Sequence, residues 1–209
     1  MNLRKHYLRA RNPRGFWGYR VLKAMNGKDH AALPEWVFAE LKIKEDAHVL
    51  DVGCGGGANV ARMLEMCPQG IVTGLDFSTL ALEESNDYNY RAIVDKKCYI
   101  VGGNVIQMPR AKEMYDLVTA FETVYFWPTL EQGVSEMFRV LKPGGTCVIA
   151  NELDGLDPAY RKLESAVGML VYTIEDITEI MTKVGFTNIQ SRHDEERHFI
   201  CVTAKKPKE

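Results

Sequence analysis

The stretch from Val49 to Gly57 reads Val-Leu-Asp-Val-Gly-Cys-Gly-Gly-Gly and predicts how the rest of the chain folds. Its apolar start fits a buried strand that ends at Asp51. Its glycines fit a tight turn in which the backbone needs unusual dihedral angles. Apolar residues then recur with helical spacing at Val60, Met63, Leu64 and Cys67. A strand, a glycine-rich turn and a helix in this order are typical of a nucleotide-binding α/β unit.

The glycine spacing leaves more than one ligand open. Gly53, Gly55 and Ala58 match the dinucleotide pattern G-x-G-x-x-G/A, which is a weak signal by itself. Asp51 lies two residues before the first of these glycines, and its carboxylate would repel a doubly negative pyrophosphate. The same carboxylate suits a ligand that carries an ammonium and a sulfonium group. A glycine-rich turn without a ligand is the alternative.

The acid and the glycines also form a longer pattern. Asp51, Gly53, Gly55 and Gly57 give D-x-G-x-G-x-G, which resembles the first motif of class I S-adenosylmethionine (AdoMet)-dependent methyltransferases. AdoMet carries both positive groups and no phosphate, so the resemblance agrees with the electrostatic argument. A dinucleotide-binding protein without methyltransferase activity is the rival interpretation.

Two later segments are similar to the same family. Gly103-Asn104-Val105, followed by Met108-Pro109, resembles a third motif in which the family has an Asp at the position of Asn104. The oxygen of an Asn side chain can accept the same hydrogen bond from an adenine amino group. Leu141 to Gly145 reads L-K-P-G-G and resembles the segment before the family's fifth strand. The resemblance covers about Ala47 to Ala204.

The resemblance implies an α/β fold with a doubly wound, mostly parallel seven-stranded sheet. The expected strand order is 3-2-1-4-5-7-6, with an antiparallel last strand and helices on both faces. Residues 1–46 are predicted to be an N-terminal helical cover, and residues 47–209 one AdoMet-binding domain. Strands are expected at 49–51, 71–76, 98–102, 115–120, 146–150, 186–191 and 198–204. Helices are expected at 30–41, 58–67, 79–92, 130–141 and 174–184, and a further helix is possible within 156–171.

Asp76 closes the second predicted strand, where such folds hold a ribose diol. One carboxylate can accept hydrogen bonds from both hydroxyls. Asp76 can also be an acid at a helix N-terminus, since Ser78 has the features of an N-cap, and both interpretations can hold together. By resemblance, Asp51 and the turn hold the methionine end of AdoMet, and other side chains surround the adenine. The expected cofactor contacts are Asp51, Gly53, Cys54, Gly55, Asp76, Phe77, Asn104, Val105 and Phe121.

The segment Phe121 to Pro128 follows the fourth predicted strand, at the edge of the sheet where ligands bind. It is unusually rich in aromatic residues for a loop. Either these rings form a wall of a substrate pocket or they plug the core. Glu122 is a candidate general base, but it could instead orient an amine or bind the cofactor's ammonium. We therefore take Glu122 and Tyr125 as catalytic candidates, and as pocket candidates His30, Trp127 and Glu152.

Composition limits the remaining possibilities. With 209 residues, 46% hydrophobic and 26% charged, the chain is typical of a soluble globular protein. It has no apolar run long enough to span a membrane, so we expect no membrane partner. Its five cysteines are scattered without a C-x-x-C pair, so we expect no disulfide framework, no metal site and a cytoplasmic location.

Basic residues are concentrated at the N-terminus. Residues 1–28 contain eight Lys or Arg and no acid, so the remainder has 18 bases against 28 acids. This basic arm could bind RNA, or it could be a solvated helix. We predict in-line methyl transfer from AdoMet to a small-molecule acceptor, with S-adenosyl-L-homocysteine as the product. The alternative is an RNA or protein methyltransferase that docks its substrate through this arm; the sequence leaves the acceptor and the oligomeric state open.

Overall fold

The computed structural model describes residues 11–27, 30–160, 166 and 168–208. The chain forms two compact units, residues 1–104 and 105–209. Their strands form one seven-stranded sheet in the order β3-β2-β1-β4-β5-β7-β6, which confirms the predicted order. In the described part of the chain, no helix is long and apolar enough to cross a membrane. The domain boundary predicted at residue 46 stays a prediction.

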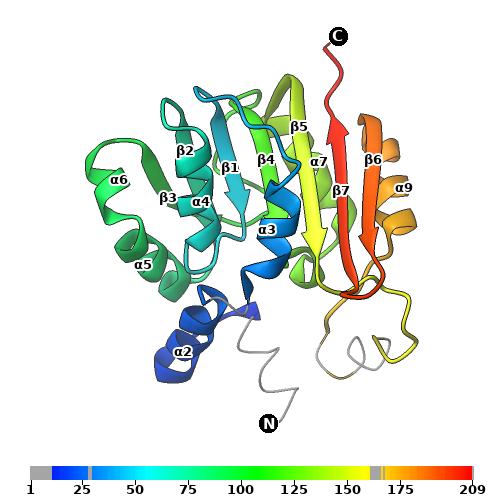
Figure 1. Ribbon diagram of the computed structural model, residues 1–209, viewed down its shortest axis with the longest axis horizontal. Coiled ribbons are helices and arrows are strands. Elements are labelled where there is room, and N and C mark those ends of the chain that lie inside the picture. The colour runs from blue at the N-terminus through cyan, green and yellow to red at the C-terminus, as the bar shows by residue number, and fades with distance from the viewer. Residues whose placement is uncertain (1–10, 28–29, 161–165, 167, 209) are drawn as a thin grey trace. The chain divides into compact units, whose positions relative to one another are not determined.

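The first unit contains three parallel strands and the helices that connect them (Figure 1). The strands are β1 (His48–Val52), β2 (Ile71–Asp76) and β3 (Cys98–Gly102). The register pairs Asp51 with Gly74 and Asp76 with Gly102. The helices are α2 (Gly15–Met25), α3 (Ala32–Phe38), α4 (Ala58–Met66), α5 (Thr79–Tyr88) and α6 (Tyr90–Val94).

The helix predicted over residues 79–92 is two helices, and the single-helix prediction is wrong. The break falls at Asn89, whose backbone leaves the helical region. Its side-chain Nδ2 donates to the carbonyl oxygens of Ser85 at 3.0 Å and of Gly57 at 3.1 Å. An Asn side chain that bonds nearby carbonyls competes with helix continuation, which explains the break.

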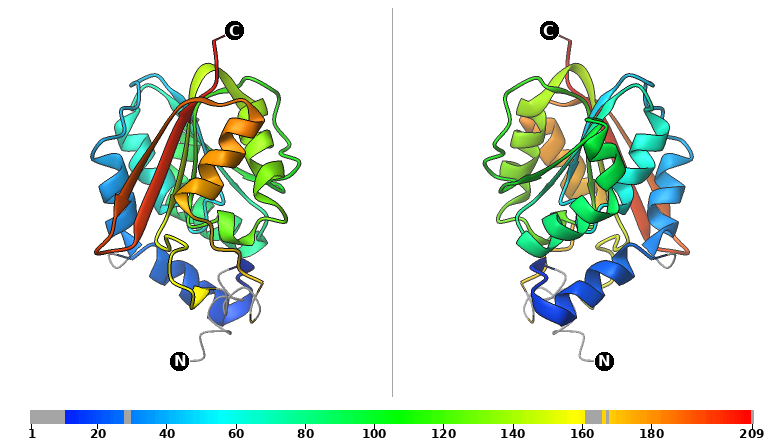
Figure 2. Two further views of the ribbon diagram at one scale, coloured as in Figure 1. Left: turned by 90° about the vertical axis from the view of Figure 1, so that its right-hand side faces the viewer. Right: turned by 90° about the vertical axis from the view of Figure 1, so that its left-hand side faces the viewer.

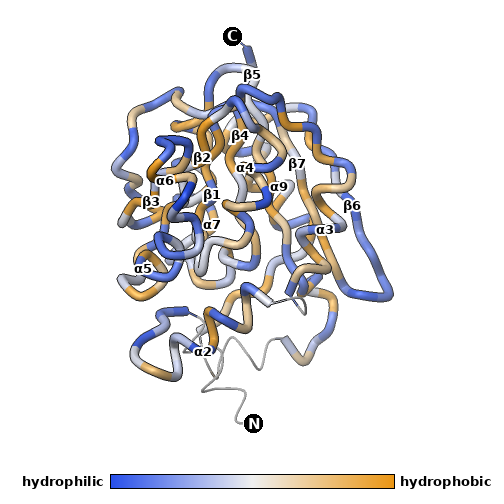
Figure 3. The backbone as a smooth tube through the Cα atoms, turned by 60° about the vertical axis from the view of Figure 1, so that its left-hand side comes forward, coloured by the Kyte–Doolittle hydropathy of each residue, from blue (hydrophilic) through white to orange (hydrophobic). Residues whose placement is uncertain are grey.

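The second unit contains β4 (Tyr115–Phe121), β5 (Leu141–Asn151), β6 (Thr187–Asp194) and β7 (Phe199–Lys205). Strands β4 and β5 are parallel, and β7 runs antiparallel to both β5 and β6, as predicted. A short 3-10 helix, η2 (Val124–Phe126), and two α-helices complete the unit: α7 (Leu130–Val140) and α9 (Ile174–Val184). Figure 3 shows β6 as hydrophilic along most of its length, which agrees with its exposure.

Helices α7 and α9 pack side by side in the second unit, as the two views of Figure 2 show. Their fully buried side chains include Val134, Met137, Ile177 and Met181. The predicted capping box at Thr173 and the left-handed Gly185 that ends α9 are both present. Phe138 and Phe186 meet edge to face, with ring centroids 4.9 Å apart. These contacts fix the helices behind β5, β6 and β7.

The segment L-K-P-G-G differs from its prediction. We expected a turn before a strand at 146–150, whereas β5 begins at Leu141. Its pairing with β4 shifts register, because Tyr115 pairs with Leu141 but Leu117 pairs with Thr146. The extra residues form a bulge, with Gly144 at a φ of 78°. The helix predicted within 156–171 lies partly outside the described residues, and residues 168–173 have no regular structure.

Candidate functional site

The turn after β1 depends on glycine. Gly53, Gly55 and Gly57 have φ values of 76°, 52° and 86°, a region that other residues rarely adopt. The amides of Gly53 and Cys54 donate to the carbonyl oxygen of Leu75 at 2.7 and 3.0 Å, which attaches the turn to β2. The turn is therefore held in one conformation by the neighbouring strand.

Gly57 also has no room for a side chain. A Cβ atom there would lie 2.4 Å from Ser85 Oγ and 2.5 Å from Asn89 Nδ2. We expect Gly57→Ala to lower the free energy of unfolding by about 2–5 kcal/mol, from left-handed strain and overpacking together. Chemical denaturation measures this. Gly15→Ala is the matched control, because Gly15 has a φ of 57° but nothing within 4 Å of the added Cβ. Equal losses in the two variants would contradict the packing argument.

Cys54 fills the inside of the turn. Its Sγ donates to Ser85 Oγ at 3.9 Å, and a Cβ on Gly74 would lie only 2.9 Å from that sulfur. Burial, reinforced by the negative charges of Asp76 and Asp51, raises the pKa of the Cys54 thiol well above its usual range. A thiol that stays protonated is a poor nucleophile, so Cys54 acts here as a small packing residue.

Two carboxylates flank this turn. Asp51 is buried in β1, with 2% of its surface exposed. Asp76 accepts hydrogen bonds from the amide of Gly55 at 3.0 Å and from the amide of Ser78 at 2.9 Å. Burial raises the pKa of Asp76, although the amides of Ser78, Gly55 and Phe77 oppose that rise. Ser78 also caps α5, as predicted, by accepting from the amide of Ala81. The two amides fix the orientation of the Asp76 carboxylate.

The remaining candidates differ in exposure. Of the cofactor candidates, Phe77 has 55% of its surface exposed and Asn104 is exposed as well; the pocket candidate His30 is also exposed. Val105 is half-buried and Phe121 is buried at the end of β4; both belong to the second unit. The roles of these residues toward a cofactor or an acceptor stay predictions.

Helix α2 covers the glycine turn within the first unit. Asn26, at its C-terminal end, donates from Nδ2 to the carbonyl oxygen of Gly56 at 2.8 Å. Leu22 is buried, and Lys23 forms an ion pair with Glu84 of α5 at 3.0 Å. The sequence carries no signal for this Asn26 contact, because Asn26-Gly27 indicates only a break in regular structure.

In the second unit, Glu122 and Tyr125 form a hydrogen-bonded pair. Tyr125 Oη donates to Glu122 Oε1 at 3.0 Å and accepts from the amide of Leu153 at 3.0 Å. The amide of Glu152 donates to the same Oε1. The pair therefore links the end of β4 to the segment after β5. Glu122 also has a φ of 55°, and such strained non-glycine residues cluster at functional sites.

The environment of Glu122 favours its neutral form. Burial, together with the charge of Glu152, raises the pKa of Glu122 to about 8, although hydrogen bonds from Glu152 and Tyr125 oppose the rise. Burial and the nearby Glu122 charge also raise the pKa of Tyr125 well above its usual range. A buried carboxyl group that titrates near pH 8 suits proton transfer.

Trp127 is a packing residue in this structure. It is 5% exposed, and its Nε1 donates to Thr123 Oγ1 at 3.3 Å. Its ring lies against α7, where a Cβ on Gly133 would approach the ring to 2.2 Å. This placement favours the core-plug interpretation of the aromatic segment, and a substrate contact for Trp127 stays a prediction.

A cluster that sequence analysis missed surrounds Asp154. Its Oδ2 lies 2.9 Å from His198 Nδ1 and 3.3 Å from His193 Nε2, and its Oδ1 accepts from the amide of Leu156 at 3.0 Å. Burial by itself would raise the pKa of Asp154, but the hydrogen bonds from Leu156, His198 and His193 outweigh it and lower that pKa. The cluster connects the segment after β5 to the β6–β7 hairpin. The sequence signal for it is the pair of histidines, His193 and His198, on either side of the predicted hairpin turn.

Strand β5 ends at Asn151, and Glu152 follows it. The side chain of Asn151 is fully buried, and neither its nitrogen nor its oxygen has a partner among the described residues. Glu152 is half-buried next to Glu122. Across residues 11–27, 30–160, 166 and 168–208, no group of three or more acidic, His or Cys side chains could hold a metal ion.

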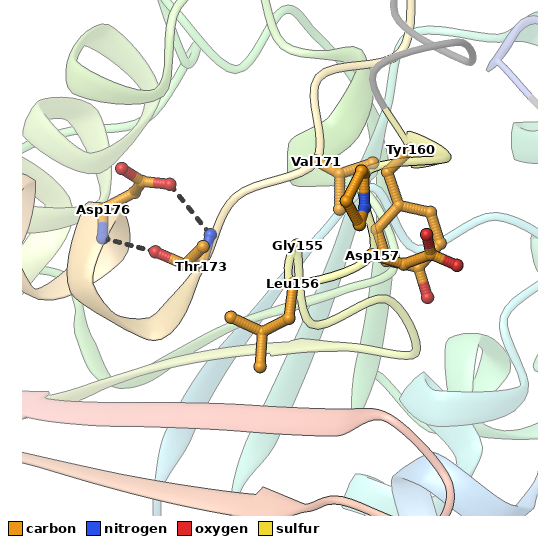
Figure 4. A pocket seen from close by; sticks show the side chains of 8 residues that line it. Gly155, Leu156, Asp157, Tyr160, Val171, Thr173 and Asp176 are labelled. Atoms are coloured by element: carbon orange, nitrogen blue, oxygen red, sulfur yellow. Dashed lines mark hydrogen bonds between the residues drawn. The ribbon is translucent and has the colours of Figure 1, made fainter.

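A cavity of about 270 Å³ lies within the second unit (Figure 4). It is lined by the segment after β5 and by the segment that leads into α9: Gly155, Leu156, Asp157, Pro158, Tyr160, Val171, Thr173 and Asp176. Asp176 Oδ2 accepts from the amide of Thr173 in the capping box. The lining also includes Tyr160 and Asp157, and Asp157 Oδ1 accepts from the amide of Ala159 at 2.7 Å.

Comparison with known proteins explains the first unit's glycine turn. Residues 50–149 match the model of a methyltransferase domain family. The chain belongs to the class I AdoMet-dependent methyltransferases. The residues around the turn fit this cofactor. Asp51 and Asp76 favour a cationic ligand. The glycines have no side chains, so a ligand can approach the backbone of the turn closely.

The methyltransferase has curated relatives among sterol-modifying enzymes. The sterol 24-C-methyltransferase of Schizosaccharomyces pombe is 32% identical over 165 residues, which cover 71% of this chain and 42% of the relative. That of Kluyveromyces lactis is 30% identical over 154 residues, covering 69% of this chain and 41% of the relative. The chain therefore matches less than half the length of these relatives.

Solved structures share the methyltransferase fold. Geranyl diphosphate C-methyltransferase from Streptomyces coelicolor, in complex with Mg²⁺, geranyl diphosphate and S-adenosyl-L-homocysteine, superposes with a TM-score of 0.74 at 15% identity. That match covers 93% of this chain and 87% of the other. An AdoMet-dependent methyltransferase from Aquifex aeolicus gives a TM-score of 0.74 at 18% identity, covering 90% and 97%. At these identities the likeness supports the fold.

Proposed function

We propose that the protein transfers a methyl group from AdoMet to a small-molecule acceptor. The observation that carries this proposal is the glycine turn with a buried acid in β1 and a hydrogen-bonded acid at the end of β2. Asp51, with Gly53, Cys54 and Gly55, would hold the methionine end, and Asp76 the ribose. When bound, AdoMet supplies a reactive methyl group and a neutral leaving group, S-adenosyl-L-homocysteine.

The protein's own part is mainly positioning, exclusion of water and handling of a proton. Glu122 is the proposed general base. The hydrogen bonds described for its carboxylate reach Oε1, so Oε2 is the oxygen proposed to take the acceptor's proton. Tyr125 orients that carboxylate as a positioning residue. The raised pKa of Glu122 means that the base form grows as the pH rises through about 8.

The cavity after β5 is proposed to hold the body of the acceptor; Glu122 does not line this cavity, so the reacting group would have to extend from it toward Glu122. Its lining is mixed: Leu156, Pro158 and Val171 are apolar, whereas Asp157 and Tyr160 add a carboxylate and a phenol ring. Among the residues described here, no Lys or Arg lines it. This chemistry suits an apolar molecule with a neutral or positively charged group, such as an amine. The small-molecule names of the sterol-modifying relatives support the same class.

A screen of candidate acceptors tests this proposal, with release of S-adenosyl-L-homocysteine as the signal. Amines and neutral apolar alcohols are expected to be methylated, and molecules with a phosphate group are not. In the next step, Val171→Trp should raise the KM for the acceptor by about tenfold or more by filling the cavity, with unchanged AdoMet affinity. Turnover of phosphate-bearing acceptors alone would contradict the assigned acceptor class.

The cellular location is also a proposal. All five cysteines are free and buried in the structure, which supports the reducing cytoplasm expected from the sequence.

A further inference from the structure

Helix α2 exposes three aromatic side chains to solvent. The exposed fractions are 67% for Phe16, 56% for Trp17 and 40% for Tyr19. Large exposed apolar side chains that gather on one element mark interaction surfaces, whereas single scattered ones do not. We use the name aromatic face for Phe16, Trp17 and Tyr19.

Positive charge accompanies the aromatic face. The Arg20 guanidinium lies 5.8 Å from the centre of the Trp17 ring, and Lys23 Nζ lies 5.2 Å from the centre of the Tyr19 ring. The described residues 11–27 carry four Lys or Arg and no acid. The partner of this surface should therefore offer negative charge beside apolar material.

The opposite side of the helix is fixed to the first unit. Leu22 is 1% exposed, and a Cβ on Gly18 would lie 2.7 Å from the backbone of Pro13. Asn26 donates to the backbone of the glycine turn. Lys23 lies beside the Tyr19 ring of the aromatic face, and its charge is paired with that of Glu84. The helix thus has one attached side and one aromatic, basic side, which is the character of a helix that lies in a membrane interface.

We propose that α2 binds the surface of an anionic lipid bilayer, with Phe16 and Trp17 inserted at the boundary of headgroups and acyl chains. Aromatic rings favour that boundary, and each basic residue near an anionic membrane adds attraction. We expected no membrane partner because no segment is long enough to span a bilayer. A helix that lies flat on the surface needs no such segment.

The ring geometry favours a bilayer over single-stranded RNA. RNA bases stack on aromatic rings that offer open, successive faces. Phe16 and Trp17 instead meet edge to face, with centroids 5.6 Å apart and an interplanar angle of 74°. The guanidinium of Arg20 already lies over the Trp17 ring. A bilayer needs no stacking geometry, only exposed apolar area and positive charge.

Cosedimentation with vesicles tests the proposal. The full chain is expected to bind vesicles of phosphatidylcholine and phosphatidylserine, and to bind phosphatidylcholine vesicles much more weakly. The double variant Phe16→Ala/Trp17→Ala should lose about tenfold or more in affinity for the phosphatidylserine vesicles. Arg20→Ala should weaken vesicle binding less than the double variant does. Added salt should weaken the binding of the unmodified protein to phosphatidylserine vesicles.

Matched aromatic residues elsewhere provide the control. Tyr88 and Tyr90 are 50% and 66% exposed in the same unit, so Tyr88→Ala/Tyr90→Ala removes comparable exposed rings. This control should bind vesicles like the unmodified protein, and both double variants should keep the thermal unfolding midpoint. The proposal is overturned if the two double variants lose affinity equally, or if neither does. Binding of polyuridylate without binding of phosphatidylserine vesicles would also overturn it and indicate RNA.

Discussion

Asp76→Ala is expected to weaken AdoMet binding by about 1–3 kcal/mol, roughly 5- to 150-fold in Kd. The carboxylate is fixed by the amides of Gly55 and Ser78, and it retains lone pairs for the two ribose hydroxyls. Removing it takes away charge-assisted hydrogen bonds to the ligand and the support of the turn. Isothermal titration calorimetry of the variant with AdoMet measures the loss.

Two further variants separate these contributions. Asp76→Asn keeps one oxygen acceptor and the side-chain size, so its loss of affinity should be smaller than that of Asp76→Ala. As a control, Asp87→Ala removes an exposed acid from α5 and should leave the Kd unchanged. Because burial raises the pKa of Asp76, AdoMet binding should weaken as the pH falls through that raised pKa. An Asp76→Ala variant that binds AdoMet like the unmodified protein would remove Asp76 from the site.

Glu122→Gln is expected to lower kcat by about 100-fold or more while AdoMet affinity stays unchanged. In the unmodified enzyme kcat should rise with pH through about 8, where Glu122 ionises. The glutamine cannot take up a proton, so the residual activity should lose this dependence. Glu152→Gln removes the charge that helps raise the Glu122 pKa, and it should move the midpoint of the profile to lower pH. A Glu122→Gln variant with an unchanged kcat and pH profile would exclude the base.

The pH dependence of the free energy of unfolding also tests the Glu122 carboxyl group, and this measurement requires no methyl acceptor. The folded-state pKa is raised from 4.5 to about 8, so between these values the folded protein binds more protons than the unfolded chain. The free energy of unfolding should therefore fall as the pH rises across this window, by on the order of a few kcal/mol at most. Glu122→Gln should remove this part of the decline. An identical pH dependence in both proteins would show that Glu122 is not buried as described.

Much of the fold is predictable because it rests on local patterns. The run from Val49 to Gly57 contains its own strand, turn and helix start, and the sheet order followed from a family resemblance that the structure confirms. The errors arose where one tertiary contact overrides a local pattern. Asn89 ends a helix by reaching Gly57, 32 residues away, and no periodicity contains that bond. The bulge after Leu141 is likewise set by pairing with β4.

The candidate site was predictable in its residue types more than in its contacts. Asp51 and Asp76 follow from the ends of two strands, and Glu122 from the end of a third. The bond between Tyr125 and Glu122, the two histidines on Asp154 and the packing of Trp127 on Gly133 depend on side-chain placement in three dimensions. Sequence spacing carries no direct signal for such contacts, because the partners come from different elements.

The central claim is that acidic groups beside the glycine turn select a cationic adenosine derivative over a dinucleotide. Calorimetry of the unmodified full chain, titrated separately with AdoMet and with NADH, tests it most directly. The account predicts saturable one-to-one binding of AdoMet and no measurable heat of binding for NADH. Saturable binding of NADH together with no binding of AdoMet would contradict it.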